Sequence, residues 1–155
     1  MGTSAYPRPM LTVDVAALTG GSAPRVLLVQ RAHPPFAGEW ALPGGFVDEG
    51  ERVAHAAARE LAEETGLKLG SLSLLGVYDT PGRDPRGWTV SITYLAPVPA
   101  EAPVTGGDDA REARWFPVDT HPKLAFDHAT IIGDALVRWA EGPDRGRGPP
   151  RHGER

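Results

Sequence analysis

Hydrophobic and polar positions in the first third of the chain predict three extended segments. Residues 10–18 partly alternate apolar and polar side chains and are rich in Val, Leu and Thr, which is typical of a strand. Residues 25–31 are apolar enough for a central strand, and the Gly-Gly-Ser-Ala-Pro turn between the two favours a hairpin. Residues 40–47 read as extended but are interrupted by a Pro-Gly-Gly run. We therefore expect a sheet that begins near the N-terminus.

The next segment, residues 52–65, has the spacing of an amphipathic helix that ends at Gly66, a residue type that closes helices in a left-handed conformation. At about 100° per residue, Glu60, Glu63 and Glu64 span an arc of about 100°. Acidic helix faces are most often simply solvated. Here, however, like charges at this spacing weaken a helix. The cluster makes physical sense if Mg²⁺ lies among the oxygens, because Mg²⁺ suits a few carboxylates completed by waters and phosphates. The apolar side chains beside this arc are those of Ala54, Ala57, Ala58 and Leu61.

The second half of the chain alternates further predicted strands with one more helix. The expected strands are residues 72–79, 89–96 and 113–118, and the expected helix is residues 127–141. These elements indicate an α/β fold in which a mixed sheet lies between two helices. We expect one domain over residues 1–142 and a disordered tail over residues 143–155, whose sequence has no periodicity.

Composition excludes several classes of function. The chain has 155 residues, a single-domain length, and no cysteine, which excludes disulfides, thiolate zinc sites and cysteine nucleophiles. A net charge of −4 gives no sign of attraction to nucleic acid or to a membrane. No apolar run approaches the roughly 20 residues of a membrane span, and no secretory signal is visible, so we expect a cytoplasmic protein. The histidines show no paired metal-ligand spacing, and His55 is expected at the surface.

The region from Gly45 to Leu67 carries the most specific motif. It reads Gly, five residues, Glu, seven residues, then Arg-Glu-Leu-x-Glu-Glu-x-Gly-Leu. This pattern resembles the Nudix box of the Nudix hydrolases with every fixed position filled. The resemblance implies an α/β/α sandwich and metal-dependent cleavage of a diphosphate linked to another group. The metal ligands and catalytic carboxylates that it implies are the carbonyl of Gly44 and the side chains of Glu60, Glu63 and Glu64.

Other positions of the box are expected to support these ligands. Eight helical residues rise about 12 Å, so Glu51 can reach Arg59 only from a loop that folds back over the helix start. The resemblance implies this pairing, which makes Arg59 an orienting residue, with Gly45 and Gly66 structural. Phe46 is expected to pack in the interior, as are Ala57 and Leu61. Nudix enzymes often recruit a later acid as general base or ligand, and the candidates before the predicted strand 113–118 are Glu112 first and Asp109 second.

The segment around Arg83-Asp84-Pro85-Arg86 resembles the ADP-ribose pyrophosphatase branch, as does Leu124-Ala125-Phe126-Asp127-His128. Arginine forks suit phosphate and ribose oxygens, and aromatic faces suit adenine. The expected substrate contacts are therefore Arg31, Arg83, Arg86, Trp40, Trp88 and Phe126. In the alternative interpretation Asp84 pairs with a neighbouring arginine to stiffen a turn, and Phe126 packs at the start of a helix.

The favoured function is Mg²⁺-dependent hydrolysis of ADP-ribose to AMP and ribose 5-phosphate, with Mn²⁺ as a substitute metal. One alternative is a nucleoside or deoxynucleoside triphosphate pyrophosphohydrolase of nucleotide-pool sanitation. Another is a non-catalytic sensor domain, which has no chemical need of all three helix carboxylates and is usually fused to a DNA-binding module for which we expect no room here. The expected partner is a small nucleotide, with neither nucleic acid nor membrane, and the resemblance makes a homodimer a candidate assembly.

Overall fold

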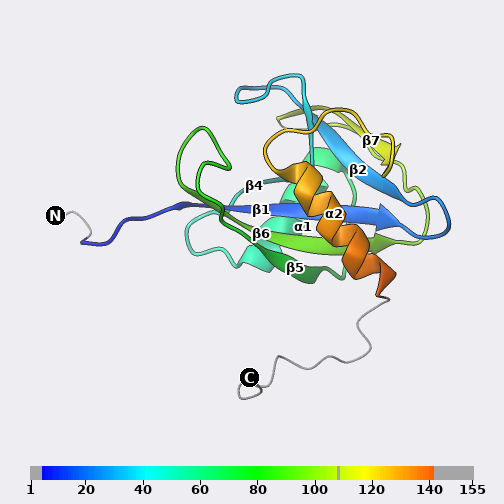
Figure 1. The fold of residues 1–155 in the computed structure, drawn as a ribbon, viewed down its shortest axis with the longest axis horizontal. Coiled ribbons are helices and arrows are strands. Elements are labelled where there is room, and N and C mark those ends of the chain that lie inside the picture. The colour runs from blue at the N-terminus through cyan, green and yellow to red at the C-terminus, as the bar shows by residue number, and fades with distance from the viewer. Residues whose placement is uncertain (1–4, 108, 142–155) are drawn as a thin grey trace, which may run out of the picture.

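The computed structural model describes residues 5–107 and 109–141, which form a mixed sheet between two helices (Figure 1). The expected α/β/α sandwich is therefore confirmed. The predicted tail, residues 143–155, lies outside the described residues. The elements in chain order are β1 (Met10–Thr19), β2 (Arg25–Arg31), β3 (Trp40–Ala41), β4 (Gly44–Phe46), α1 (Val53–Thr65), β5 (Ser73–Tyr78), β6 (Thr89–Val98), β7 (Ala110–Pro117) and α2 (His128–Ala140).

The sheet divides where β1 and β2 separate. These antiparallel strands share one pair of Cα partners, Leu18 and Val26, and then diverge (Figure 1). The other edge of β1 pairs with β6 in parallel over its whole length, and β2 pairs with β7. Near the gap, β4 pairs with β1 and β3 pairs with β2. The Pro-Gly-Gly segment therefore lies between the two halves of the sheet.

Each face of the sheet carries its own apolar core. Along β1, Val13, Val15 and Ala17 belong to the cluster that includes Leu61 of α1. Ala16 and Leu18 belong to the cluster that includes Ile131, Ile132 and Ala135 of α2. This alternation follows from the two-residue period of a strand, which sends successive side chains to opposite faces. A strand apolar on both faces is thus covered by a helix on each side.

Helix α1 ends as its sequence predicts. Gly66 has φ of 74° and donates its N–H to the carbonyl of Ala62, which caps the helix in the left-handed conformation. One strand boundary differs by more than two residues from the prediction. The expected strand at 113–118 begins three residues earlier, at Ala110, because the pairing of β7 with β2 continues to Arg31. Glu112 is therefore a strand residue and not a residue of the preceding loop.

Candidate active site

A cavity of about 320 Å³ opens where β1 and β2 diverge. Its walls come from both halves of the sheet, from the Pro-Gly-Gly segment, from α1, from the loop between β5 and β6, and from the start of α2. The polar, glycine and aromatic residues that concern its chemistry are Asp14, Arg31, Gly44, Gly45, Phe46, Glu60, Glu64, Arg83, Asp84, Arg86, Asp109, Phe126 and His128. Residues distant in sequence thus face one space.

Gly44 and Gly45 pass so close to the carboxylates of the cavity that a side chain at Gly44 would clash with backbone and one at Gly45 would require the Glu60 side chain to move. A Cβ on Gly44 would lie 2.2 Å from the carbonyl oxygen of Val13 and 2.5 Å from Oδ1 of Asp14. A Cβ on Gly45 would lie 2.6 Å from the carboxyl carbon of Glu60. Real Cβ atoms essentially never approach within 3.0 Å of such neighbours. The two glycines therefore let the backbone run directly against acidic side chains.

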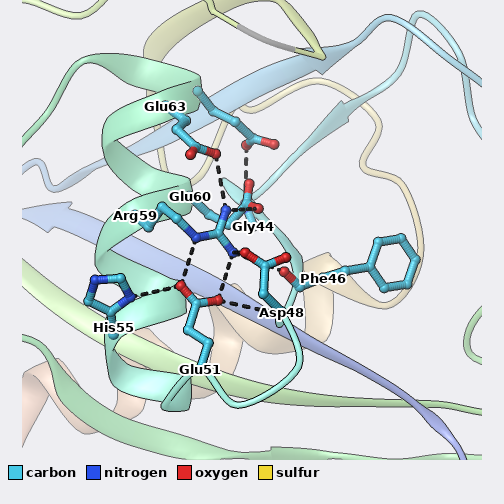
Figure 2. A network of polar contacts seen from close by, with 9 residues as sticks. Gly44, Phe46, Asp48, Glu51, His55, Arg59, Glu60 and Glu63 are labelled. Atoms are coloured by element: carbon cyan, nitrogen blue, oxygen red, sulfur yellow. Dashed lines mark hydrogen bonds and ion pairs between the residues drawn. The ribbon is translucent and has the colours of Figure 1, made fainter.

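Arg59 lies at the centre of the polar network beside this segment (Figure 2). Its Nε and Nη2 donate to the two oxygens of Glu51 at 2.8 and 2.9 Å, from the loop two residues before α1 begins. Its Nη1 donates to Glu60 at 2.8 Å and to Glu63 at 3.1 Å, and Nη2 also donates to the Phe46 carbonyl at 3.1 Å. The guanidinium thus connects the loop, the Gly-Gly segment and the acidic face of α1. The hydrogen bonds that Arg59 donates to Glu51 are the main reason that the pKa of Glu51 falls from 4.5 to about 2.

Glu64 is the cavity carboxylate whose pKa departs furthest from its ordinary value. Its Oε2 accepts the N–H of Gly44 at 3.1 Å, which links α1 directly to the glycine segment. Burial raises the pKa of Glu64 from 4.5 to about 8, and repulsion from Glu60 and Asp14 adds to the effect of burial. Negative charge is therefore crowded at this point, and a bound cation would relieve the repulsion.

The donors present here fit a divalent cation. Carboxylate and carbonyl oxygens are the ligands that Mg²⁺ prefers, and Glu60, Glu64 and the Gly44 backbone supply them within one cavity. Among residues 5–107 and 109–141, no three His, Asp or Glu side chains are already gathered closely enough to hold a metal. Glu63, the third carboxylate of the helix face, is bonded to Arg59 and is absent from the cavity lining.

Arg83 and Arg86 both line the cavity, and each is held by a carboxylate. Arg83 donates to Asp127 through Nε at 3.0 Å and Nη2 at 2.6 Å, and its side chain is 4% exposed. Arg86 donates to Asp84, whose side chain is 2% exposed. Burial alone would raise the pKa of Asp84, but hydrogen bonds from Arg86 lower it below the usual range. The turn-stiffening role considered for Asp84 is thus present, and it coexists with a lining role for both arginines.

Phe126 is held in an uncommon backbone conformation at the cavity wall. Its φ is +53°, a left-handed value that bulky residues rarely adopt. The guanidinium of Arg31 lies 5.0 Å from the centre of its ring and that of Arg86 lies 5.7 Å away. The ring of Phe36 meets it edge-on at 4.9 Å. Phe126 therefore organises the two arginines by cation–π contacts, and its ring is less open to a base than the sequence suggested.

Of the other aromatic residues, the two expected to contact substrate lie outside the cavity lining, and one expected to pack in the interior lies in it. Trp40 packs edge-on against Phe116 at 4.8 Å and is not a lining residue, because β3 directs it into the core cluster of α2. Trp88 is 52% exposed but also lies outside the lining. Phe46, expected in the interior, is 44% exposed and lines the cavity with Arg86 stacked over its ring at 5.0 Å. The other two residues expected to pack, Ala57 and Leu61, are fully buried.

Of the two later acids, Asp109 lines the cavity and Glu112 does not. Glu112 lies on β7 and forms an ion pair with Arg114 on the same strand. Asp109 stands 3.6 Å from the ring of His33 at the mouth of the cavity, with a side chain that is 85% exposed. The placement therefore favours Asp109 over the first-choice Glu112.

The sequence of residues 8–135 matches the NUDIX domain family. The chain belongs to the Nudix family. The predicted enzyme class, a Nudix pyrophosphohydrolase, is confirmed with it, and Nudix hydrolases generally use divalent metal ions.

Several relatives of this Nudix chain are linked to ADP-ribose by name. It is 50% identical over 118 residues to the ADP-ribose pyrophosphatase of Methanocaldococcus jannaschii, covering 76% of this chain and 69% of that protein. It is 34% identical to the ADPR responsive transcriptional repressor NtrR of Acinetobacter baylyi, covering 87% of this chain and 56% of the repressor. The NUDIX domain of Shewanella oneidensis NrtR, solved with ADP ribose, superposes with a TM-score of 0.79 at 35% identity, covering 87% and 91% of the two chains.

Asp14, Asp84 and His128 line the cavity of this Nudix domain, and Asp127 holds Arg83 at its wall, but none of the four was selected as a site residue from the sequence. Asp14 accepts a hydrogen bond from Ser91 at 2.5 Å, and Nε2 of His128 lies 3.5 Å from the other oxygen of Asp14. Asp84 and Asp127 hold the two arginines of the β5–β6 loop. A signal existed for three of them, because Asp84, Asp127 and His128 lie inside the two segments that resemble the ADP-ribose branch. Asp14 gave none, since it sits in an ordinary apolar strand.

Proposed function

We propose that this Nudix pyrophosphohydrolase cleaves ADP-ribose to AMP and ribose 5-phosphate in a Mg²⁺-dependent reaction, with Mn²⁺ as a substitute. The observation that carries the proposal is the single cavity shared by Glu60, Glu64 and the two arginines of the β5–β6 loop. Groups suited to a metal–diphosphate centre thus face groups suited to the rest of a nucleotide sugar. The archaeal ADP-ribose pyrophosphatase and the ADP ribose complex of the similar NUDIX domain support this substrate.

In this proposal each part of the cavity has a separate task. Gly44, Glu60 and Glu64 would hold the cation, with Glu63 as a further ligand or catalytic carboxylate. The cation, when bound, supplies charge neutralisation at the diphosphate and Lewis-acid activation of the attacking water. Asp109 is the candidate general base, because it is the later acid that lines the cavity.

The substrate contacts follow from the charge of the cavity wall. Arg31 donates its Nε to the carbonyl of Pro35 at 2.7 Å, so this hydrogen bond leaves its positive charge uncancelled and suited to a phosphate. Arg83 and Arg86 are oriented by Asp127 and Asp84, which reduces the entropy lost when they grip ribose or phosphate oxygens. Phe46, exposed at the cavity, is a better candidate than Trp40 for stacking on adenine.

The role of Glu63 and the choice of substrate can be tested together on the purified protein. Purified protein with Mg²⁺ should release AMP and ribose 5-phosphate from ADP-ribose, and should act less efficiently on deoxynucleoside triphosphates. Glu63→Gln should lower kcat by about a hundredfold or more, the scale of losing one electrostatic or proton-transfer contribution, while ADP-ribose binding stays measurable. Product release followed by chromatography, together with calorimetric binding, provides the measurement.

The control for this experiment is Glu101→Gln, which neutralises an exposed glutamate paired with Arg25 outside the cavity lining. It should leave turnover unchanged. Unchanged turnover in Glu63→Gln would contradict the assignment of that carboxylate. A panel in which triphosphates are cleaved faster than ADP-ribose would instead favour nucleotide-pool sanitation, for which the similar 8-oxo-dGTP diphosphatases match 32% to 46% of this chain.

A sensor function is the second candidate, favoured by the similarity to the ADPR responsive repressor. Tight ADP-ribose binding without turnover by the wild-type protein would support it.

No helix in the described parts of the chain is long and apolar enough to cross a membrane. A cytoplasmic location, a homodimer, one domain over residues 1–142 and the absence of a nucleic-acid partner stay predictions.

A further inference from the structure

His128 lies at the first position of α2, buried against the back of the cavity, with 3% of its surface exposed. Its Nδ1 accepts the backbone N–H of Leu42 at 2.9 Å. An imidazole nitrogen that accepts this hydrogen bond carries no proton, so the neutral ring bears its proton on Nε2. Nε2 in turn faces Oδ1 of Asp14 at 3.5 Å. The ring therefore has one well-defined orientation.

The segment that His128 holds is the one that presents Gly44. From Leu42 to Gly44, successive backbone groups are engaged by different elements of the fold. The Leu42 N–H is bound by His128 of α2, the Pro43 carbonyl accepts the N–H of Val15 at 2.9 Å, and the Gly44 N–H is bound by Glu64 of α1 at 3.1 Å. The two helices, one on each face of the sheet, thus both hydrogen-bond to this short segment.

We infer that His128 is a positioning residue for the metal centre, acting through the Leu42 N–H to set the place of the Gly44 backbone against Glu64. The inference rests on the proposed function, because it takes Gly44 and Glu64 as metal-holding groups. Proline at position 43 has no N–H, so the Leu42 N–H bound by His128 is the nearest backbone donor on the N-terminal side of Gly44. Groups that orient metal ligands in this way typically change metal affinity or activity by about 10–100-fold when they are mutated.

Two substitutions separate the two contacts of the ring. His128→Asn keeps an acceptor at the δ position, where Nδ1 meets Leu42, and removes the Nε2–H that faces Asp14. His128→Gln places its amide near the ε position and removes the δ acceptor. His128→Ala removes both groups. His121→Asn is the matched control, because His121 contacts the carbonyl of its neighbour Pro122 and does not line the cavity.

Mn²⁺ affinity is measured by calorimetry on the full chain without substrate, and kcat and KM with ADP-ribose and Mg²⁺ are measured separately. We expect His128→Ala and His128→Gln to weaken Mn²⁺ binding by about 10–100-fold and to lower kcat more than they raise KM. His128→Asn should retain most of the wild-type Mn²⁺ affinity and kcat, and His121→Asn should match the wild type. Amide hydrogen exchange at Leu42 should accelerate in the Ala and Gln variants alone.

Equal Mn²⁺ affinity in the Asn and Gln variants would overturn the inference, as would wild-type affinity in either the Gln or the Ala variant. If His128→Ala does not fold, the comparison of Asn with Gln decides alone. A wild-type protein that binds Mn²⁺ but cleaves no ADP-ribose would defeat the proposed function and leave the Mn²⁺ comparison as the test of His128.

Discussion

Glu64 is the residue at which protonation and metal binding should be most tightly linked. Its pKa is raised from 4.5 to about 8 by burial and by repulsion from Glu60 and Asp14. Between these values the folded protein holds a proton that the unfolded chain has released, so the metal-free protein loses stability as the pH rises through that interval. A cation must displace this proton to bind the carboxylate, and Mn²⁺ affinity should therefore rise with pH up to about 8.

Calorimetric Mn²⁺ titrations in buffers of different ionisation enthalpy measure this linkage directly, because the apparent heat reports the protons released. Wild-type protein should release close to one proton per cation below the raised pKa. Glu64→Gln should bind more weakly and lose this proton release. Proton release that persists in the glutamine variant would assign the linkage to another group.

Two residues of this site that the sequence did not single out have partners far along the chain. Asp14 is paired with Ser91 at a separation of 77 residues, and His128 with Leu42 at a separation of 86. Neither pairing leaves a local pattern, because each depends on which strands become neighbours. Glu60 and Glu64, by contrast, were identified as candidates because one helix turn brings them together.

At the scale of elements, the loop before α1 is joined to the helix by the Glu51–Arg59 pair (Figure 2). Arg59 lowers the pKa of Glu51 from 4.5 to about 2. A depressed carboxylate pKa adds stability above the unfolded value, and this contribution is lost as the pH falls through the folded value. Glu51→Gln should therefore be less stable than the wild type at neutral pH, with a difference that narrows from about pH 4.5 to about pH 2.

Urea unfolding curves across this pH range provide the measurement. Glu49→Gln, in the same loop and exposed, is the matched control and should follow the wild type throughout. A stability difference for Glu51→Gln that is independent of pH would mean that shape, rather than charge, joins the loop to the helix.

Element types and most of their ends were predictable from the sequence, but the division of one extended segment was not. Helix α1 was expected from residue 52 and begins at Val53, because helical spacing and the glycine cap are local signals. The segment at 40–47 was predicted as extended, yet it forms two short strands, β3 and β4, that pair with different neighbours. That division is imposed by the separation of β1 from β2, a property of the assembled sheet that no local sequence window contains.

At the scale of the whole molecule, the two core clusters share β1 as a common wall. Val13 and Val15 face the α1 side, while Ala16 and Leu18 face the α2 side. Both clusters also meet around the cavity, because the start of α2 and the acidic face of α1 line it together. Since one strand serves both cores, loss of packing on either side should weaken the same cooperative structure.

Because the two core clusters share β1, core substitutions can test the prediction that residues 1–142 form one domain. Leu61 of α1 and Ile131 of α2 are both fully buried, one in each cluster. Leu61→Ala and Ile131→Ala should each lower the free energy of unfolding by about 2–5 kcal/mol, the range for deleting a large aliphatic side chain from a core. Val137→Ala, at a position 63% exposed on α2, should have little effect. In each variant, fluorescence and far-ultraviolet circular dichroism should report one coincident transition, whereas a separate early transition in only one core variant would show that the two faces of the sheet unfold independently.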